Sequence, residues 1–329
     1  MPRVFDTLLL LALPASGKSE TRNYLTKRNP DQFHMGPTVQ LDDYPYVHMQ
    51  VLVDKALARL GMPQAYHRAD SPTEENGPFM DVRELHGLIV LLNQDYAELR
   101  AGHVNVPENA GEAMLARFDD ASAAAGAPRK FDDIAPDLRA KLAAAIDAEA
   151  RALCEERAAA CPKSLDGYTI VIEFARGGPE GDSMPLPPLL GYKANLPYLS
   201  DELLAKAAIL YIRVDPAESR RKNRARARPD GAGSILFHGT PESVMMAEYA
   251  RCDMPWLVET APVPGTVRVE AHSGTTFDVP IAMFDNRQDL TTFLREEDDT
   301  KWAPEDVRKI HSSLKAACDG LWDTWSRGR

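Results

Sequence analysis

The sequence predicts an α/β fold, in which a five-stranded parallel sheet is covered by helices and carries a helical insertion and an Arg-rich segment. The first observation is a series of long apolar runs separated by helical stretches, because strands of a parallel sheet are buried on both faces. The second is a Ser-Gly-Lys-Ser sequence that follows the first apolar run. The third is a dense basic group at 213–228, in a chain whose net charge is −11.

Five apolar runs are expected to form the sheet. In chain order they are "VFDTLLLLAL" (4–13), "TVQLDDYPY" (38–46), "YTIVIEFARGG" (168–178), "AAILYIRVDP" (207–216) and "DVPIAMFDN" (278–286). The second run ends on two aspartates and a tyrosine, and a glycine pair stops the third. Polar residues at the end of such runs lie where parallel sheets bind ligands.

Helices are expected between and after these runs. The residues from Ser19 to Lys27 follow the first run, and apolar residues recur at helical spacing over 85–99 and 138–153. The Ala-rich segment 121–130 between them is expected to be a loop or a frayed helix. An apolar stripe over 307–325 predicts a closing amphipathic helix.

The composition is that of a globular protein and limits the classes of partner. The chain has 329 residues, enough to bury a sizeable core, with 44% hydrophobic and 26% charged residues. A net charge of −11 argues against general binding of nucleic acid or anionic membranes, since both need a dominant positive field. Small phosphorylated ligands need only a local basic site.

The cysteines and the N-terminal apolar run predict a cytoplasmic location. The run at 8–13 is shorter than the roughly 7–15 residues of an export signal core, and far shorter than the ~18 residues of a membrane span. Four cysteines in a chain of this length fit a reducing compartment better than a disulfide framework. Their spacing to the eight histidines does not suggest a zinc site.

Residues Ala12–Ser19 match the phosphate-loop pattern G-x-x-x-x-G-K-[ST], except that Ala12 replaces the first glycine. In this pattern, backbone N–H groups surround the phosphates of a nucleotide at the N-terminus of a helix. The lysine reaches the β- and γ-phosphates, and the hydroxyl holds Mg²⁺. The residues expected to bind ATP here are Pro14, Ala15, Ser16, Gly17, Lys18, Ser19 and Glu20.

From these residues the chain resembles the P-loop kinases of small molecules, a group that includes adenylate kinase, uridine-type nucleoside kinases and dephospho-coenzyme A kinase. The resemblance is carried by "LPASGKS" (13–19), the acidic strand end "QLDDYPY" (40–46), the Arg-rich segment after "VDP" and "FDNRQDL" (284–290). It implies a three-layer P-loop NTPase fold with an Arg-rich lid. Residues 50–165 lie outside this resemblance.

The resemblance also implies a division of the chain. The kinase core is expected to comprise 1–49, 165–215 and 259–329. Residues 50–164 are expected to form a helical insertion on the side of the phosphate acceptor, and 216–258 the lid.

The acidic strand end carries Asp42 and Asp43. In uridine-type kinases a similarly placed aspartate orients and deprotonates the accepting hydroxyl, and two neighbouring carboxylates would also organise magnesium. The residues do not decide which of the two aspartates is the base, and a solvated Asx-turn after the strand is the alternative. Tyr44 and Tyr46 are expected to contact the acceptor.

Glu173 ends the apolar part of the third run, where the resembled kinases carry an acid that holds the magnesium shell through water. Together with Ser19 it is the predicted magnesium site. Arg176 follows three residues later and is expected to grip the acceptor or a phosphate. The alternative is that Glu173 and Arg176 form a surface ion pair of little consequence.

The segment 213–228 holds seven basic residues against two acidic ones. The resemblance makes it the lid, in which Arg220, Arg221 and Arg224 would neutralise charge on the transferred phosphoryl group. The alternative is a solvated basic helix or a nucleic-acid patch, although interleaved aromatic residues are missing. In "FDNRQDLTTFLRE" (284–296), the backbone and the side chain of Asn286 are expected to frame the adenine, with a plain strand-to-helix turn as the alternative.

These features predict an ATP- and Mg²⁺-dependent phosphotransferase that acts on a hydroxyl of a small molecule such as a nucleoside or a sugar, with a phosphate as the alternative acceptor group. A P-loop NTPase or a nucleotide-dependent regulatory protein is the alternative from another class. A toxin-type kinase of sugar nucleotides would use the same core with a different acceptor. The identity of the acceptor does not follow from residues 50–164.

Overall fold

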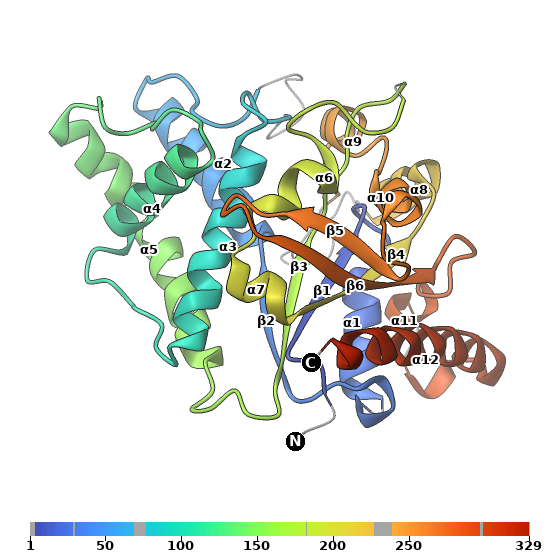
Figure 1. Ribbon diagram of the computed structural model, residues 1–329. Coiled ribbons are helices and arrows are strands. Elements are labelled where there is room, and N and C mark those ends of the chain that lie inside the picture. The colour runs from blue at the N-terminus through green and yellow to red at the C-terminus, as the bar shows by residue number, and fades with distance from the viewer. Residues whose placement is uncertain are drawn as a thin grey trace. The chain divides into compact units, whose positions relative to one another are not determined.

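The computed structural model describes residues 4–28, 30–68, 77–181, 183–226, 239–296 and 299–328 (Figure 1). The chain divides into two units. The first, here the sheet unit, comprises Met1–Gln40, Asp166–Pro197 and Asp201–Arg329. The second, here the helical unit, comprises Leu41–Leu165 and Tyr198–Ser200. The helical unit thus begins earlier than the predicted insertion at residue 50, and the predicted lid segment is grouped with the sheet unit.

The sheet has six strands in the order β2-β3-β1-β4-β6-β5. The strands are β1 (Thr7–Ala12), β2 (Thr38–Asp42), β3 (Thr169–Phe174), β4 (Ala207–Arg213), β5 (Thr266–Glu270) and β6 (Thr276–Asp285). β1 pairs in parallel with β3 and β4, β4 pairs in parallel with β6, and β5 is antiparallel to β6. The α/β class is confirmed, and each of the five apolar runs overlaps one of the strands.

The predicted all-parallel, five-stranded sheet is wrong, because β5 is a sixth and antiparallel strand. β5 and β6 form a hairpin whose turn is closed by a hydrogen bond from Ala271 N–H to Thr275 O at 2.9 Å. In β5, Val267 is buried and Arg268 is exposed. This short edge strand alternates between buried and exposed positions, so it lacks the continuous apolar run by which the other strands were predicted.

Every residue of β1 is buried, since helices pack on both faces of the sheet. Leu8 and Leu10 belong to a core that also contains residues of α1 (Lys18–Lys27) and α12 (Pro304–Arg327). On the opposite face, the ring of Tyr192 lies 6.3 Å from that of Tyr211. The predicted C-terminal amphipathic helix is α12, which buries Ile310, Leu314, Cys318, Leu321 and Trp325.

Short helices complete the sheet unit. They are α6 (Gly191–Asn195), α7 (Asp201–Lys206), α8 (Pro216–Arg226), α9 (Glu242–Glu248), α10 (Met254–Thr260) and α11 (Phe293–Glu296). Single turns of 3-10 helix lie at Pro30–Phe33, Leu196–Tyr198 and Asp299–Lys301. Within the described ranges, every helix is too short or too polar to traverse a lipid bilayer.

The helical unit consists mainly of α2 (Tyr44–Arg59), α3 (Glu84–Arg100), α4 (Ala110–Ala124) and α5 (Pro136–Ala160). α3 and α5 contain the stretches 85–99 and 138–153 and confirm the helices predicted there. The Ala-rich segment 121–130 is the last turn of α4 followed by a loop. Tyr44, placed in a strand run by the sequence, instead begins α2, because a proline follows it at the first turn of a helix.

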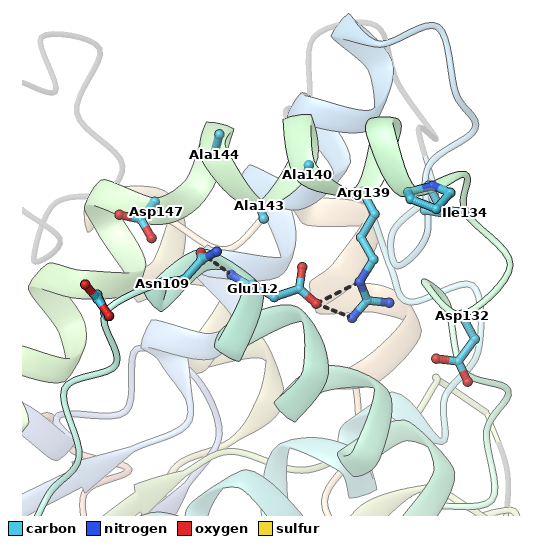
Figure 2. A pocket seen from close by; sticks show the side chains of 11 residues that line it. Asn109, Glu112, Asp132, Ile134, Arg139, Ala140, Ala143, Ala144 and Asp147 are labelled. Atoms are coloured by element: carbon cyan, nitrogen blue, oxygen red, sulfur yellow. Dashed lines mark hydrogen bonds and ion pairs between the residues drawn. The ribbon is translucent and has the colours of Figure 1, made fainter.

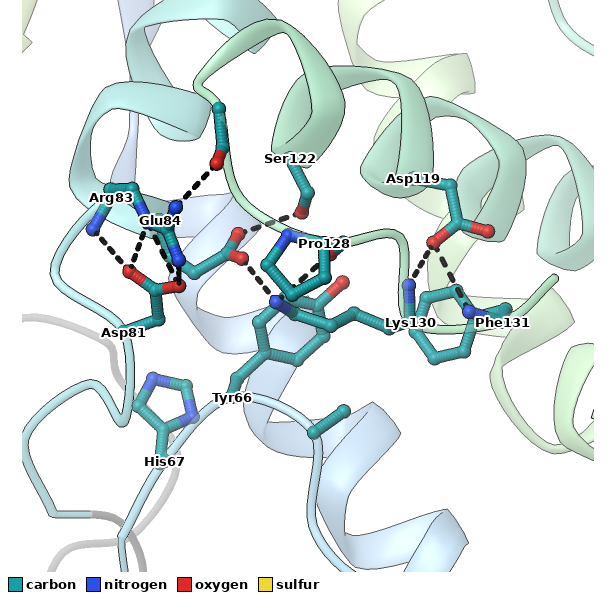
Figure 3. A network of polar contacts seen from close by, with 12 residues as sticks. Tyr66, His67, Asp81, Arg83, Glu84, Asp119, Ser122, Pro128, Lys130 and Phe131 are labelled. Carbon is teal, nitrogen blue, oxygen red and sulfur yellow. Dashed lines mark hydrogen bonds and ion pairs between the residues drawn. The ribbon is translucent and has the colours of Figure 1, made fainter. Parts of the chain in front are cut away.

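A buried ion pair joins α3 to the loop after α4 (Figure 3). Glu84 is 2% exposed, and its Oε1 lies 2.6 Å from Nζ of Lys130. Ser122 donates a hydrogen bond to Glu84 Oε2 at 2.8 Å. Burial raises the pKa of Glu84, whereas the bond and the charge of Lys130 oppose this shift. Lys130 therefore compensates a carboxylate that would otherwise be buried alone.

Replacing Lys130 by methionine is expected to lower the free energy of unfolding by about 3–5 kcal/mol, because it leaves the Glu84 carboxylate without its counter-charge. Urea unfolding at neutral pH measures this change. The matched control is Lys141→Met, which removes an ion pair to Asp137 at 3.8 Å between two exposed side chains and is expected to cost less than ~1 kcal/mol. Equal losses for the two variants would contradict the compensating role of Lys130.

Candidate functional site

The predicted phosphate loop (Ala12–Ser19), called the phosphate loop below, leaves the sheet at its topological switch point. β1 lies between β3 and β4. The strands that follow β1 in the sequence, β2 and β3, lie on one side of it in the sheet, and the later strands β4, β5 and β6 lie on the other side. Open α/β sheets bind ligands in the crevice at the carboxyl ends of such strands. Here the loop leads from Ala12, the last residue of β1, to Lys18, the first residue of α1.

Two residues of the loop have a left-handed backbone. Ala15 has φ of 53° and Gly17 has φ of 93°. Ala12 is part of the extended strand, where any residue is accommodated, so the missing first glycine of the pattern does not prevent the loop from turning. A Cβ added to Gly17 would lie 2.4 Å from Thr291 Oγ1, so only glycine fits this turn.

The loop ends at the N-terminus of a ten-residue helix. The first helical hydrogen bond runs from Thr21 N–H to Gly17 O at 2.9 Å. In the described part of the chain, no protein group accepts a hydrogen bond from the amides of Gly17, Ser19 or Glu20. Unpaired amides and the helix dipole make such a terminus an anion-binding feature.

Three side chains from distant parts of the sequence hold the loop carbonyls. Tyr192 Oη donates to Ala12 O at 3.1 Å, Ser219 Oγ donates to Pro14 O at 2.6 Å, and Asn286 Nδ2 donates to Ser16 O at 2.8 Å. All three side chains belong to buried residues. These three hydrogen bonds therefore fix the backbone of the loop through its carbonyl groups. Sequence reasoning missed the roles of Tyr192 and Ser219, because no local pattern marks a side chain that contacts a loop two hundred residues away.

Glu173 lies at the carboxyl end of β3 and is 2% exposed. Its Oε1 lies 3.3 Å from Nε of Arg22 and 3.5 Å from Nε2 of Gln40. Burial raises the pKa of Glu173, and the positive charges of Arg22 and Lys18 oppose the shift. The partner of Glu173 is thus Arg22 of α1 rather than Arg176, and the phosphate-loop lysine is close enough to act on its charge.

The raised pKa of Glu173 gives a testable pH dependence. A carboxyl with a higher pKa in the folded state stabilises the fold when protonated, and this contribution is lost as the pH rises through the folded pKa. Glu173→Gln cannot ionise, so its free energy of unfolding should increase relative to the wild type as the pH rises above about 4.5. Urea unfolding of both proteins between about pH 4 and pH 8 measures the difference. A difference that falls with pH would show that Arg22 and Lys18 outweigh burial.

Ser19 and Glu173 are the residues predicted to hold magnesium. Oε1 of Glu173 lies near Nε of Arg22 and Nε2 of Gln40. Ser19 is half-buried in the first turn of α1. Among the described residues, no group of three or more His, Cys, Asp or Glu side chains is arranged to hold a metal ion. Mg²⁺ bound to nucleotide phosphates keeps several waters and needs only one or two protein ligands.

The flanking helix residue Glu20 is already paired within the protein. Its Oε1 lies 3.3 Å from Nη1 of Arg295, on the segment that follows β6. Its backbone amide still belongs to the unpaired set at the start of α1. A contact of Glu20 with nucleotide would therefore come from its main chain rather than from its carboxylate.

Arg176 and Asn286 are more deeply buried than the sequence suggested. Arg176 is 1% exposed, with Nε donating to Asn195 Oδ1 at 2.8 Å and Nη1 donating to Ala175 O at 2.6 Å. Asn286 is fully buried. The side chain of Arg176 packs over the ring of Phe174 at the end of β3, and that of Asn286 contacts the phosphate loop. Their predicted contacts with an acceptor and with adenine stay predictions.

Asp42, Asp43, Tyr44 and Tyr46 belong to the helical unit. Asp42 Oδ1 accepts a hydrogen bond from Tyr44 N–H at 2.9 Å, which is the Asx-turn of the alternative interpretation. Asp43 is 8% exposed and precedes α2, and Tyr44 is 38% exposed. Tyr46 is buried, and its hydroxyl donates a hydrogen bond to Asp95 Oδ2 at 2.6 Å. The predicted contacts of Tyr44 and Tyr46 with an acceptor stay predictions.

The Arg-rich segment forms α8, of which 216–226 is described. Arg221 pairs with Glu218 at 2.6 Å and Arg224 with Glu242 at 3.0 Å, and both arginines are exposed. Arg220 is half-buried, and its Nη1 has no hydrogen-bond partner among the described residues. The rest of the predicted lid up to residue 238, including Arg228, lies outside the described residues. The sequence did not distinguish Lys222, whose side chain is buried in this helix.

A groove of about 730 Å³ lies on the helical unit between α4 and α5 (Figure 2). Acidic side chains of Glu112, Asp132 and Asp147 line it together with Arg139, which pairs with Glu112 at 2.8 Å. None of the predicted site residues contributes to its lining. The groove is therefore a separate feature from the candidate nucleotide site.

No family model matches the chain, and no curated protein is significantly similar to it in sequence. The geometry of the chain itself therefore carries the functional inference.

Proposed function

We propose that this protein is a P-loop kinase, an ATP- and Mg²⁺-dependent phosphotransferase that acts on a hydroxyl of a small molecule. The observation that carries the proposal is the loop between β1 and α1. The backbone amides of Gly17, Ser19 and Glu20, which flank Lys18, have no hydrogen-bond acceptor among the described residues. Such a loop at the switch point of a mostly parallel sheet supports a three-layer P-loop NTPase fold.

In this proposal the loop amides and the ammonium group of Lys18 bind the β- and γ-phosphates. Ser19 and Glu173 would hold Mg²⁺, which would neutralise charge on the phosphate oxygens. The transferred phosphoryl group would be stabilised by Arg220, Arg221 and Arg224. Arg220 is half-buried and follows Ser219, which donates to Pro14 O, and the other two arginines are exposed.

Asp42 or Asp43 accepts the proton of the attacking hydroxyl. The hydroxyl oxygen then forms a bond to the γ-phosphorus, while the bond from that phosphorus to the bridging β–γ oxygen breaks and ADP leaves. The reaction needs positioning and electrostatic stabilisation and no covalent enzyme intermediate. Replacing each aspartate separately by asparagine should abolish transfer in one case and leave ATP binding close to normal.

The decisive experiment measures ADP release from ATP in the presence of Mg²⁺ over a panel of nucleosides, sugars, nucleotides and vitamins. A kinase releases ADP faster with one acceptor class, and the phosphorylated acceptor appears in equal amount. Chelation of Mg²⁺ should stop both. Slow turnover that no acceptor changes would instead favour the NTPase or regulatory alternative, and absence of nucleotide binding would exclude all of these functions.

A further inference from the structure

The turn after β6, here the post-β6 turn (Asn286–Thr292), is tied to the phosphate loop. Asn286 Nδ2 donates to Ser16 O and to Thr291 Oγ1, each at 2.8 Å. Its Oδ1 accepts from Leu290 N–H at 2.7 Å. The side chain is fully buried, so these bonds occupy both donors of the amide inside the protein. One asparagine thus fixes the shape of the turn and one carbonyl of the phosphate loop together.

The same turn is tied to the Arg-rich helix α8. Asp289 Oδ1 lies 2.6 Å from Nζ of Lys222, whose side chain is 6% exposed. The same oxygen accepts from Thr292 Oγ1 at 2.8 Å and from Thr292 N–H at 3.2 Å. The backbone of Asp289 is left-handed, with φ of 54°, which fits a tightly constrained turn. A buried cation of α8 is therefore bound to a carboxylate whose position the turn determines.

Two further contacts fix α8 independently of the ion pair. Ser219 Oγ donates to Pro14 O at 2.6 Å, and Asn223 exchanges two hydrogen bonds with the backbone of Thr240, at 2.7 and 2.9 Å. The ion pair lies between these two anchors along the helix. It is a third anchor of the part of α8 that carries Arg220, Arg221 and Arg224, and it joins this part to the post-β6 turn.

We infer that Asn286, Asp289 and Lys222 are positioning residues, through which the post-β6 turn sets the Arg-rich helix in register with the phosphate loop for phosphoryl transfer. The inference rests on the proposed function. Charge develops on the oxygens of the transferred group, so the groups that bind the β-phosphate and the arginines that meet the γ-phosphate must keep a fixed separation. A misplacement of about 1 Å costs up to ~10²-fold in rate. The post-β6 turn contacts both the phosphate loop and α8, so it can keep the separation between them fixed.

Asp289→Asn and Lys222→Met are expected to lower kcat for ADP release by about 10- to 100-fold while the Kd for ATP stays within about threefold of the wild type. The double variant should lose no more than Asp289→Asn alone, because this single variant already removes the ion pair to Lys222 together with the 3.9 Å contact of Asp289 with Arg221. Lys222→Arg, which keeps the charge, should retain most of the activity. Asn286→Ser, which lacks the second donor, should in contrast weaken ATP binding, since Asn286 contacts the phosphate loop itself.

The matched control is Asp278→Asn, which removes the exposed ion pair to Arg268 at 2.9 Å on the β5–β6 hairpin and should leave kcat and Kd unchanged. Thermal unfolding of every variant shows whether a loss of activity follows a loss of folded protein. Unchanged kcat in Asp289→Asn, or equal losses in kcat, ATP binding and folded fraction, would overturn the inference. A wild-type protein that binds no ATP would overturn the proposed function as well, whereas an active wild type with an equally active Asp289→Asn would overturn the inference alone.

Discussion

Lys18→Ala is expected to lower acceptor-dependent ADP release by about 10²–10³-fold while the chain remains folded. Lys18 is the first residue of α1 and directly follows the left-handed Gly17. In the proposed function its ammonium group binds the β- and γ-phosphates, whose charge changes during transfer. The loss corresponds to about 3–4 kcal/mol of transition-state stabilisation.

Steady-state kinetics with the best acceptor of the panel measure this effect, and thermal unfolding shows whether the variant is folded. Lys27→Ala is the matched control, because it removes an exposed lysine from the last turn of the same helix. The control should behave as the wild type. Equal activity of Lys18→Ala and Lys27→Ala would remove the basis of the proposed function.

Gly17→Ala is expected to abolish measurable ATP binding. The new Cβ would lie 2.4 Å from Thr291 Oγ1 and 3.0 Å from Asn286 Nδ2, and φ of 93° is unfavourable for alanine. The loop must then move away from the post-β6 turn, which disperses the amides that bind phosphate. We expect the free energy of unfolding to fall by about 1–3 kcal/mol. Isothermal titration with ATP and urea unfolding measure the two effects.

Gly61→Ala separates backbone strain from crowding. Gly61 also has a positive φ, 72°, but a Cβ there would meet no atom within 4 Å. This variant should lose stability through strain alone and bind ATP normally. In Gly17→Ala/Thr291→Ala the crowding is reduced, so part of the ATP affinity should return. If Gly17→Ala binds ATP like the wild type, the contact between the loop and the turn does not shape the site.

Local patterns in the sequence determined the elements that are buried on all sides or strictly periodic. β1, β3 and β4 are continuous apolar runs, and α3, α5 and α12 carry apolar residues at helical spacing. In each of these elements the pattern of buried residues can be recognised within one short segment of the sequence. The same holds for the phosphate loop, whose glycine, lysine and serine must be adjacent. β5 and α4 escaped prediction, because an edge strand and an Ala-rich helix carry weaker patterns.

Only the tertiary structure decided which side chains meet. Sequence proximity suggested Arg176 as the partner of Glu173, but Arg22 of α1 lies beside it, because parallel pairing brings the end of β3 next to the phosphate loop. Tyr192, Ser219 and Asn286 converge on the loop carbonyls from three segments that are far apart in the chain. Hydrogen bonds depend on distances of a few tenths of an ångström between such segments, and these distances are set by packing rather than by any local residue pattern.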